Sequence, residues 1–338
     1  MKFKVIAKIV TFGLIIPAML GASIMAVRAY YSPLGNDLQL PTVAIESSDM
    51  QVLPTATAIA AKVSAQESVC GESGVWNVLV LGTESTEKHG NAGSDFIRMM
   101  RVDFLNRQVT LFAFPPDLWV DTSGLGLINP ATQSMSMYLG TVFQEARSRS
   151  TYTVTKDAML DGTTASATAL FQNFTVSTHF YLTVDLSQVP MMVDAVGGVP
   201  INIPQTMTDP WIGMTIPSGP QTLNGAQFVA YARAIPDSDF ARAQRHDLLM
   251  EALREKLVDP AVWGQIPQLY ARFNGMIVTN FSPEQINHLS CLLKEVSPNA
   301  IVNDGVKQEW TSPGPAPDSL YWDKIQILNQ LKILKFVP

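Results

Sequence analysis

The sequence contains little charge, few cysteines and few histidines. Only 15% of its 338 residues are charged, against roughly 25% in an ordinary soluble protein. Low charge combined with 47% hydrophobic residues excludes an intrinsically disordered chain. The net charge of −6 argues against a nucleic acid partner. Two cysteines exclude a disulfide-dense scaffold and any four-cysteine metal site.

The common catalytic signatures are absent as well. The chain has no glycine-rich phosphate loop ending in Lys-Ser or Lys-Thr, no His-Glu-x-x-His and no Gly-x-Ser-x-Gly. Its four histidines are scattered along the sequence. None of them indicates a catalytic site by its position alone.

An uncharged run covers residues 9–27 near the amino terminus. As a helix it spans about 28 Å, close to the thickness of the bilayer's hydrocarbon core. Three lysines precede the run and Arg28 follows it, so the positive-inside rule places residues 1–8 in the cytoplasm. We therefore expect a single-pass anchor in the cell membrane with the rest of the chain on the extracytoplasmic side. The alternative is a cleaved signal peptide, because residues 27–29 resemble a cleavage site.

Residues 28–74 are predicted to form an extracytoplasmic linker or stalk. The segment has no sustained helical or strand period and is rich in Ala, Ser, Thr, Gly and Pro in its second half. Cys70 lies near its end, and Cys291 lies far along in a predicted helix. In an oxidising compartment the two can form a disulfide. The alternative is one buried and one exposed thiol, since a sequence gives no distances.

Short apolar runs alternate with helical patterns over residues 75–258, which predicts an α/β fold. We expect a three-layer α/β/α sandwich with a mixed central sheet. Strands are predicted at 76–82, 96–102, 109–114, 180–184 and 199–203. Helices are predicted at 157–173, 187–196, 224–233 and 241–258. Residues 259–338 are expected to be a helical appendage packed on this domain, with helices starting at Ser282 and near residue 318.

One segment concentrates charge in a chain that has little of it. Residues 233–245 contain three arginines and two aspartates. Arg242 and Arg245 are three residues apart, so they share one face of the predicted helix. They lie in its first turns, where the helix dipole favours anions, and guanidinium groups suit a phosphate or diphosphate. The alternative is a surface network of arginines and aspartates.

This segment and several others resemble motifs of the LytR-CpsA-Psr family. The resemblance covers about residues 75–258, and the predicted anchor with an external domain fits the family too. The matching stretches, in chain order, are NVLVLG at 77–82, GSDF at 93–96, AFPPD at 113–117, LINPA at 127–131, VDAVGGV at 193–199, LNGAQFVAYAR at 223–233 and DFARAQRH at 239–246.

The resemblance implies a phosphotransferase that moves a glycopolymer from a polyprenyl-diphosphate carrier to peptidoglycan. A sugar hydroxyl attacks the phosphorus that bears the polymer, and polyprenyl phosphate leaves. Positioning and charge neutralisation supply most of the catalysis in such reactions, and the carrier's lipid tail would lie in an apolar groove. The catalytic residues implied are Asp95, Asp117 and Asp239, of which Asp95 and Asp117 would hold Mg²⁺. The phosphate-binding residues implied are Arg233, Arg242 and Arg245.

The sequence departs from the family pattern at four motif positions. The substitutions are Gly93 for Arg, Phe96 for Thr, Pro116 for Arg and His246 for Gln. Two arginines of the pattern are thus missing, and each lost charge-assisted bond costs about 1.5–3 kcal/mol. Arg98 and Arg101 are unusual for the strand in which they lie. Three residues apart, they project from opposite faces of a strand, so one of them can return a positive charge to the pocket.

These departures leave more than one function open. The first is an active glycopolymer–peptidoglycan phosphotransferase. The second is a degenerate module that binds a polyprenyl-phosphate lipid or wall polymer with little turnover. A phosphatase or pyrophosphatase acting on the carrier lipid is a further option, because water can replace the acceptor. Transcription regulation is disfavoured by the negative charge, the lack of a helix-turn-helix pattern and the predicted topology.

Overall fold

The computed structural model describes most of the chain beyond the amino-terminal region. The described residues are 28–38, 40, 69–83, 93–149, 156–209, 212–234, 239–263, 265, 268–269, 272–273 and 277–337. The predicted membrane segment, residues 9–27, lies outside them, as does most of the predicted stalk. Within the described ranges, no helix has the length and apolar character needed to cross a bilayer.

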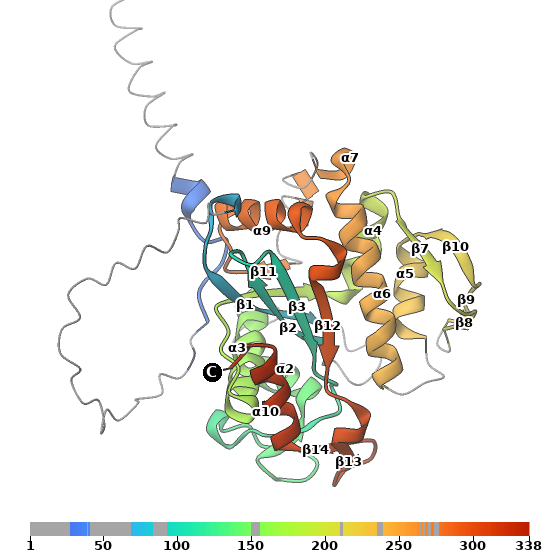
Figure 1. Cartoon of the computed structure of the whole chain (residues 1–338). Coiled ribbons are helices and arrows are strands. Elements are labelled where there is room, and N and C mark those ends of the chain that lie inside the picture. Colours follow the sequence, from blue (N-terminus) through green and yellow to red (C-terminus); the bar gives the residue numbers. More distant parts are fainter. Residues whose placement is uncertain are drawn as a thin grey trace, which may run out of the picture.

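A six-stranded mixed sheet forms the centre of the molecule (Figure 1). In order across the sheet its strands are β11 (Ile277–Thr279), β6 (Phe180–Asp185), β1 (Val75–Thr83), β2 (Ser94–Asp103), β3 (Gln108–Ala113) and β12 (Ile301–Gly305). The β1–β6 and β3–β12 pairs are parallel, and the other three pairs are antiparallel. The predicted α/β fold with a mixed central sheet is confirmed.

Helices cover both faces of this sheet because side chains alternate along its strands. Leu79, Leu81 and Met99 share one buried cluster with residues of α3 and α10, whereas Val78 and Val102 share another with Leu292 of α9. The helices are α2 (Leu139–Ser148), α3 (Lys156–Phe174), α4 (Val189–Ala195), α5 (Gly225–Arg233), α6 (Asp239–Val258), α7 (Pro260–Trp263), α9 (Pro283–Glu295) and α10 (Lys324–Ile333).

A smaller unit lies beside the sheet and has a core of its own. β7 (Val199–Ile203) pairs with β10 (Gly219–Leu223) rather than with the central sheet. The hairpin of β8 (Met207–Thr208) and β9 (Thr215–Ile216) packs with them, and α4, α5 and α6 complete the cluster. Gly197 and Gly198, both at positive φ, turn the chain from α4 into β7. α5 and α6, which bear the charged segment, are therefore held by this second core.

The carboxy-terminal tail is part of the main fold and not a helical appendage. β11 and β12, both from the tail, are the two edge strands of the central sheet. α10 buries Ile327 and Leu331 in the same cluster as β1 and β2. These two strands were not predicted because β11 is three residues long and β12, with the sequence IVNDG, ends in turn-forming residues. The helix predicted at Ser282 is confirmed, with a complete capping box.

The remaining elements are short. They are β4 (Trp119–Asp121) paired with β5 (Ser136–Tyr138), β13 (Thr311–Pro313) paired with β14 (Leu320–Trp322), and the 3-10 turns η1 (Val69–Gly71), η2 (Ser123–Leu125), η3 (Leu186–Gln188), η4 (Pro298–Ala300) and η5 (Gln308–Trp310).

Two parts of the predicted stalk are attached to the domain. The Leu34 amide donates to the Phe281 carbonyl at 2.9 Å, and the Tyr181 hydroxyl donates to the Asn36 carbonyl at 2.8 Å. At its other end Cys70, in η1, forms a disulfide with Cys291 of α9, with a Cα–Cα distance of 5.6 Å. Of the two alternatives for the cysteines, the structure has the disulfide.

Candidate functional site

A pocket lies where the start of β2 meets the end of β3 and the first turns of α6. Three of the motif stretches identified in the sequence, 93–96, 113–117 and 239–246, contribute to it. The lining residues that bear on chemistry are Asp95, Phe96, Arg98, Pro116, Arg242 and His246. The fold thus brings together, in one cavity, stretches that are far apart in the chain.

Asp95 and Arg242 are the two predicted site residues that line this pocket. Asp95 is the second residue of β2 and is exposed, while Arg242 lies in the first turn of α6 and is half-buried. One supplies a carboxylate and the other a guanidinium at the same opening. That pair can bind an anion and, beside it, either a cation or the proton of an attacking hydroxyl.

Arg98 lines the same pocket from the middle of β2, although it belongs to no family motif. Its side chain is only 2% exposed. Nη2 donates to the Ala243 carbonyl at 2.8 Å and lies 3.0 Å from Asp247 Oδ1 in an ion pair. The guanidinium carbon lies 5.0 Å from the centre of the Phe96 ring. Burial lowers the pKa of Arg98, and Asp247 opposes that shift.

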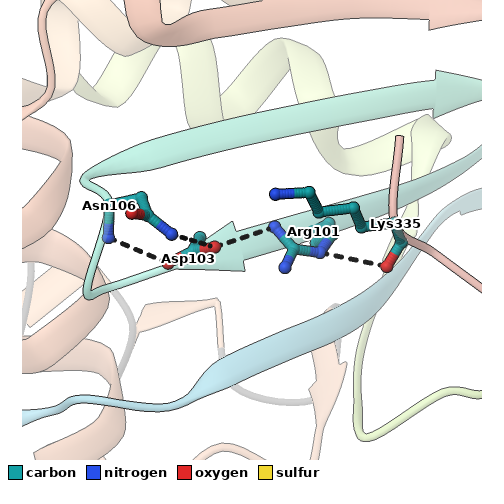
Figure 2. A network of polar contacts seen from close by, with 4 residues as sticks. All are labelled: Arg101, Asp103, Asn106 and Lys335. Carbon is teal, nitrogen blue, oxygen red and sulfur yellow. Dashed lines mark hydrogen bonds and ion pairs between the residues drawn. The ribbon is translucent and has the colours of Figure 1, made fainter. Parts of the chain in front are cut away.

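Arg101 projects from the opposite face of β2, as its spacing from Arg98 predicted. Its Nε donates to the Lys335 carbonyl at 3.2 Å, and its Nη1 contacts Asp103 Oδ2 at 3.1 Å (Figure 2). Asn106 also donates to Asp103. Burial by itself raises the pKa of Asp103, but these hydrogen bonds and the Arg101 charge hold it below its ordinary value. Arg101 therefore ties β2 to the carboxy terminus, and Arg98 alone of the two faces the pocket.

His246 is held neutral beside these arginines. Burial, and after it the charges of Arg98, Arg242 and Arg245, lower the pKa of His246 to about 3, and the hydrogen bond to the Ala232 carbonyl opposes only a smaller part of this shift. Its Nε2 lies 3.2 Å from the Ala232 carbonyl, so in the neutral ring Nε2 carries the proton and donates it. The ring centre lies 5.4 Å from that of Phe96. The positive charge of the pocket thus comes from arginine and not from histidine.

This neutral histidine predicts an acid-sensitive fold. In the unfolded chain His246 takes up a proton near its ordinary pKa of 6.5, but in the folded protein only near pH 3. Its contribution to stability is therefore complete above pH 6.5 and is lost as the pH falls toward 3, by at most about 1.4 kcal/mol per pH unit. His246→Gln, which restores the residue of the family pattern, should flatten the fall of the melting temperature between pH 6.5 and 4. Equal slopes in both proteins would contradict this account.

The other predicted site residues have different surroundings. Arg245 is buried, and its Nη2 donates to the Ala234 carbonyl, which ties α6 to the end of α5. Arg233 is the last residue of α5 and is absent from the pocket lining. Asp117 directly follows Pro116 and acts on Tyr138. Burial, together with the charges of Asp117 and Asp318, raises the pKa of the Tyr138 hydroxyl. Asp239 begins α6, but its side chain lies outside the described residues.

Close packing explains why one motif arginine is replaced by glycine. A Cβ added to Gly93 would lie 2.7 Å from the carbonyl oxygen of Gly140, and one added to Gly140 would lie 2.8 Å from Pro116 Cβ. The Gly140 amide donates to the Pro116 carbonyl at 2.8 Å. The start of α2 therefore closes onto both positions where the family pattern has arginine. An arginine at residue 93 requires a backbone shift, so Gly93→Arg is not a clean test of a missing charge.

Of the two metal ligands implied by the resemblance, Asp95 lines the pocket, and Asp117 is not among the lining residues. Across the described ranges, no three His, Cys, Asp or Glu side chains are grouped to hold a metal ion. Mg²⁺, however, is commonly held by one or two carboxylates together with substrate phosphates and water. Asp95, exposed at the pocket, would supply one such carboxylate.

Comparison with known families matches the motifs found in the sequence. The model of the LytR_cpsA_psr family matches residues 46–331. The chain belongs to this family. The match extends through the tail as far as α10, in agreement with a single fold in which the tail supplies both edge strands of the sheet.

Individual LytR-CpsA-Psr relatives are distant in sequence. The regulatory protein MsrR of Staphylococcus aureus (strain COL) is 25% identical over 208 residues, which cover 60% of this chain and 56% of MsrR. The chain thus spans just over half the length of that relative. Among solved structures, B. subtilis TagV has a TM-score of 0.61 at 16% identity, covering 79% of this chain and 100% of that one. The LytR-Csp2A-Psr enzyme from Actinomyces oris has a TM-score of 0.55 at 18% identity, covering 76% and 89%. These likenesses establish the fold.

Sequence reasoning missed one member of the site, Asp247. Ala243 and Asp247 are four residues apart and therefore share a helix face, and both contact Arg98. That spacing is visible in the sequence. The packing of this face of α6 against β2 is not.

Proposed function

We propose that this chain is a cell-envelope phosphotransferase that moves a glycopolymer from a polyprenyl-diphosphate carrier to peptidoglycan. The observation that supports it most is the pocket in which Asp95 and Arg242, from separate family motifs, lie together with the buried Arg98. Membership in the LytR_cpsA_psr family supports a role with cell-wall glycopolymers. A related fold, TagT, has been solved bound to LIIa-WTA, with a TM-score of 0.58 at 14% identity.

In this proposal the arginines bind the diphosphate and the aspartates serve the incoming sugar. The acceptor hydroxyl forms a new bond to the phosphorus that bears the polymer, and the bridging bond to the carrier's other phosphate breaks. Polyprenyl phosphate leaves, and the hydroxyl proton passes to a carboxylate. Arg242, which lines the pocket, counters the charge that accumulates on the phosphate oxygens. Asp95 would hold Mg²⁺, which when bound neutralises part of the diphosphate charge.

The proposed location is the cell membrane, with a single amino-terminal span and the domain on the extracytoplasmic side. The disulfide between Cys70 and Cys291 supports it, because structural disulfides persist in oxidising compartments outside the cytosol. The uncharged run at residues 9–27, with basic residues mainly on its amino-terminal side, supports the same topology.

The second candidate is a module that binds the carrier lipid with little turnover. It is favoured by the packing at Gly93, where an added Cβ would lie 2.7 Å from the Gly140 carbonyl oxygen, so the family's motif arginine does not fit there without a backbone shift. The same pocket would then hold a lipid diphosphate without the full set of charges that stabilises the transition state.

A transfer assay with the full-length protein separates these candidates. It would contain Mg²⁺, peptidoglycan and a polyprenyl-diphosphate-linked oligosaccharide, and it would measure both released polyprenyl phosphate and sugar attached to peptidoglycan. We expect Arg242→Ala to lower turnover by about ten- to a hundredfold, because a charge-assisted bond to the transition state is lost.

The matched control is Arg254→Ala. Arg254 lies on the same helix, paired with Glu251 at 2.7 Å and outside the pocket lining, so turnover should be unchanged. Binding of the lipid-linked probe without turnover would favour the second candidate. Turnover that survives Arg242→Ala and Asp95→Ala together would refute this site.

A further inference from the structure

Arg98 brings a positive charge to the pocket from a position outside the family motifs. Two motif positions that hold arginine in the family pattern are Gly93 and Pro116 here, and the start of α2 is packed against both. Arg98 lies on the pocket-facing side of β2, close to the same opening, and lines the cavity together with Arg242. A positive charge that these two motifs lack is thus present on β2.

The guanidinium of Arg98 is only partly satisfied by the protein. Nη2 contacts the Ala243 carbonyl and Asp247. Nε and Nη1 are buried, and neither has a hydrogen-bond partner in the described part of the chain. These two atoms carry three of the five N–H donors of the side chain. Leaving donors of a charged group buried and unpaired is costly, and acceptor oxygens entering the pocket would remove that cost.

The surroundings of Arg98 strengthen its attraction for an anion. One side of the guanidinium lies over the Phe96 ring, and His246 beside that ring is neutral. Among the described residues, the acid that pairs with Arg98 is Asp247 of α6, whose side chain is 26% exposed. A charge in such low-dielectric surroundings interacts more strongly with a phosphate than one in water. Phe96, which replaces the family's threonine, thus covers one side of the Arg98 guanidinium.

We propose that Arg98 is a phosphate-contacting residue of this protein that takes the place of the two missing motif arginines. Its Nε and Nη1 donate to oxygens of the carrier diphosphate, while Nη2 stays on Ala243 and Asp247. Asp247 is a positioning residue that fixes the guanidinium toward the pocket. This inference rests on the proposed function, because it names a further ligand-binding residue of the same site.

Calorimetric titration of the full-length protein tests the inference. Farnesyl diphosphate serves as the probe for a lipid headgroup and inorganic pyrophosphate as the probe for a free anion. Arg98→Met should weaken the binding of both by about ten- to a hundredfold, the effect of losing charge-assisted hydrogen bonds. Arg98→Lys, which keeps the charge and some donors, should recover part of the affinity.

The control is Arg101→Met, which removes an arginine from the same strand on the opposite face. It should leave the affinity unchanged even where it lowers the melting temperature. If Arg98→Met binds farnesyl diphosphate as tightly as the unaltered protein while Arg242→Ala binds weakly, the role of Arg98 is refuted and the proposed function stands. If the unaltered protein binds neither probe, the role of Arg98 and the proposed function are both refuted.

A second variant guards against loss of folding. Arg98→Met combined with Asp247→Ala removes both charges of the ion pair, so neither is left unpaired in the interior. This double variant should melt close to the unaltered protein and still bind farnesyl diphosphate weakly. Normal affinity in a folded double variant would overturn the proposal.

Discussion

Replacing Asp247 with alanine is expected to lower the free energy of unfolding by about 3 kcal/mol, because it leaves the buried guanidinium of Arg98 without its ion-pair partner. Arg98 is 2% exposed, and Asp247 is its ion-pair partner at 3.0 Å. Without Asp247 the guanidinium keeps, among the described residues, the hydrogen bond to the Ala243 carbonyl and the contact with the Phe96 ring. Removing one partner of a buried pair costs more than the pair itself contributes, since the remaining charge has lost its solvation and gained nothing in return.

Urea denaturation of four proteins measures this effect. They are the unaltered chain, the Asp247→Ala and Arg98→Met single variants, and the double variant. Asp247→Ala should be the least stable, and adding Arg98→Met to it should restore most of the loss. Glu251→Ala is the matched control, because Glu251 lies one turn further along α6 in the more exposed pair with Arg254. Its cost should stay below about 1 kcal/mol. An Asp247→Ala protein as stable as this control would contradict the assignment of a buried pair.

Loss of the Cys70–Cys291 disulfide should also cost about 3 kcal/mol. The bond joins residues 221 positions apart and encloses nearly all of the central sheet. A cross-link over so long a loop removes much of the conformational freedom of the unfolded chain. It also holds η1 against α9, where Cys70 packs on the cluster of Trp76 and Phe104.

Denaturation with and without dithiothreitol tests this prediction. The reductant should lower the urea midpoint of the unaltered protein to that of the Cys70→Ala/Cys291→Ala double variant. The same reductant should have no effect on the double variant, which serves as the control. A midpoint that does not respond to reduction in the unaltered protein, under conditions where free thiols are detected, would show that the cross-link adds little stability.

Much of the fold was predictable because its signals are local. The apolar runs of β1, β2, β3 and β6 are long enough to be recognised, and the capping pattern at Ser282 fixes the start of α9 within four residues of sequence. The edge strands β11 and β12 were not predictable. Their residues form strands because β6 and β3 offer unpaired edges at the right place, and that partner is a property of the whole sheet.

The candidate site likewise has features that the sequence predicts and features that only the folded structure shows. The sequence by itself determined the family, the membership of Asp95 and Arg242 in its motifs, and the opposite orientations of Arg98 and Arg101, since each follows from residue order and strand or helix period. Only the tertiary structure decided that Arg98 is buried at the pocket, where it donates to the Ala243 carbonyl and pairs with Asp247. It also decided that Arg245 donates to the Ala234 carbonyl and so connects α6 to the end of α5. These contacts join residues far apart in the chain. The burial of Arg98, which strengthens the interactions of its charge, exists only once the layers have packed.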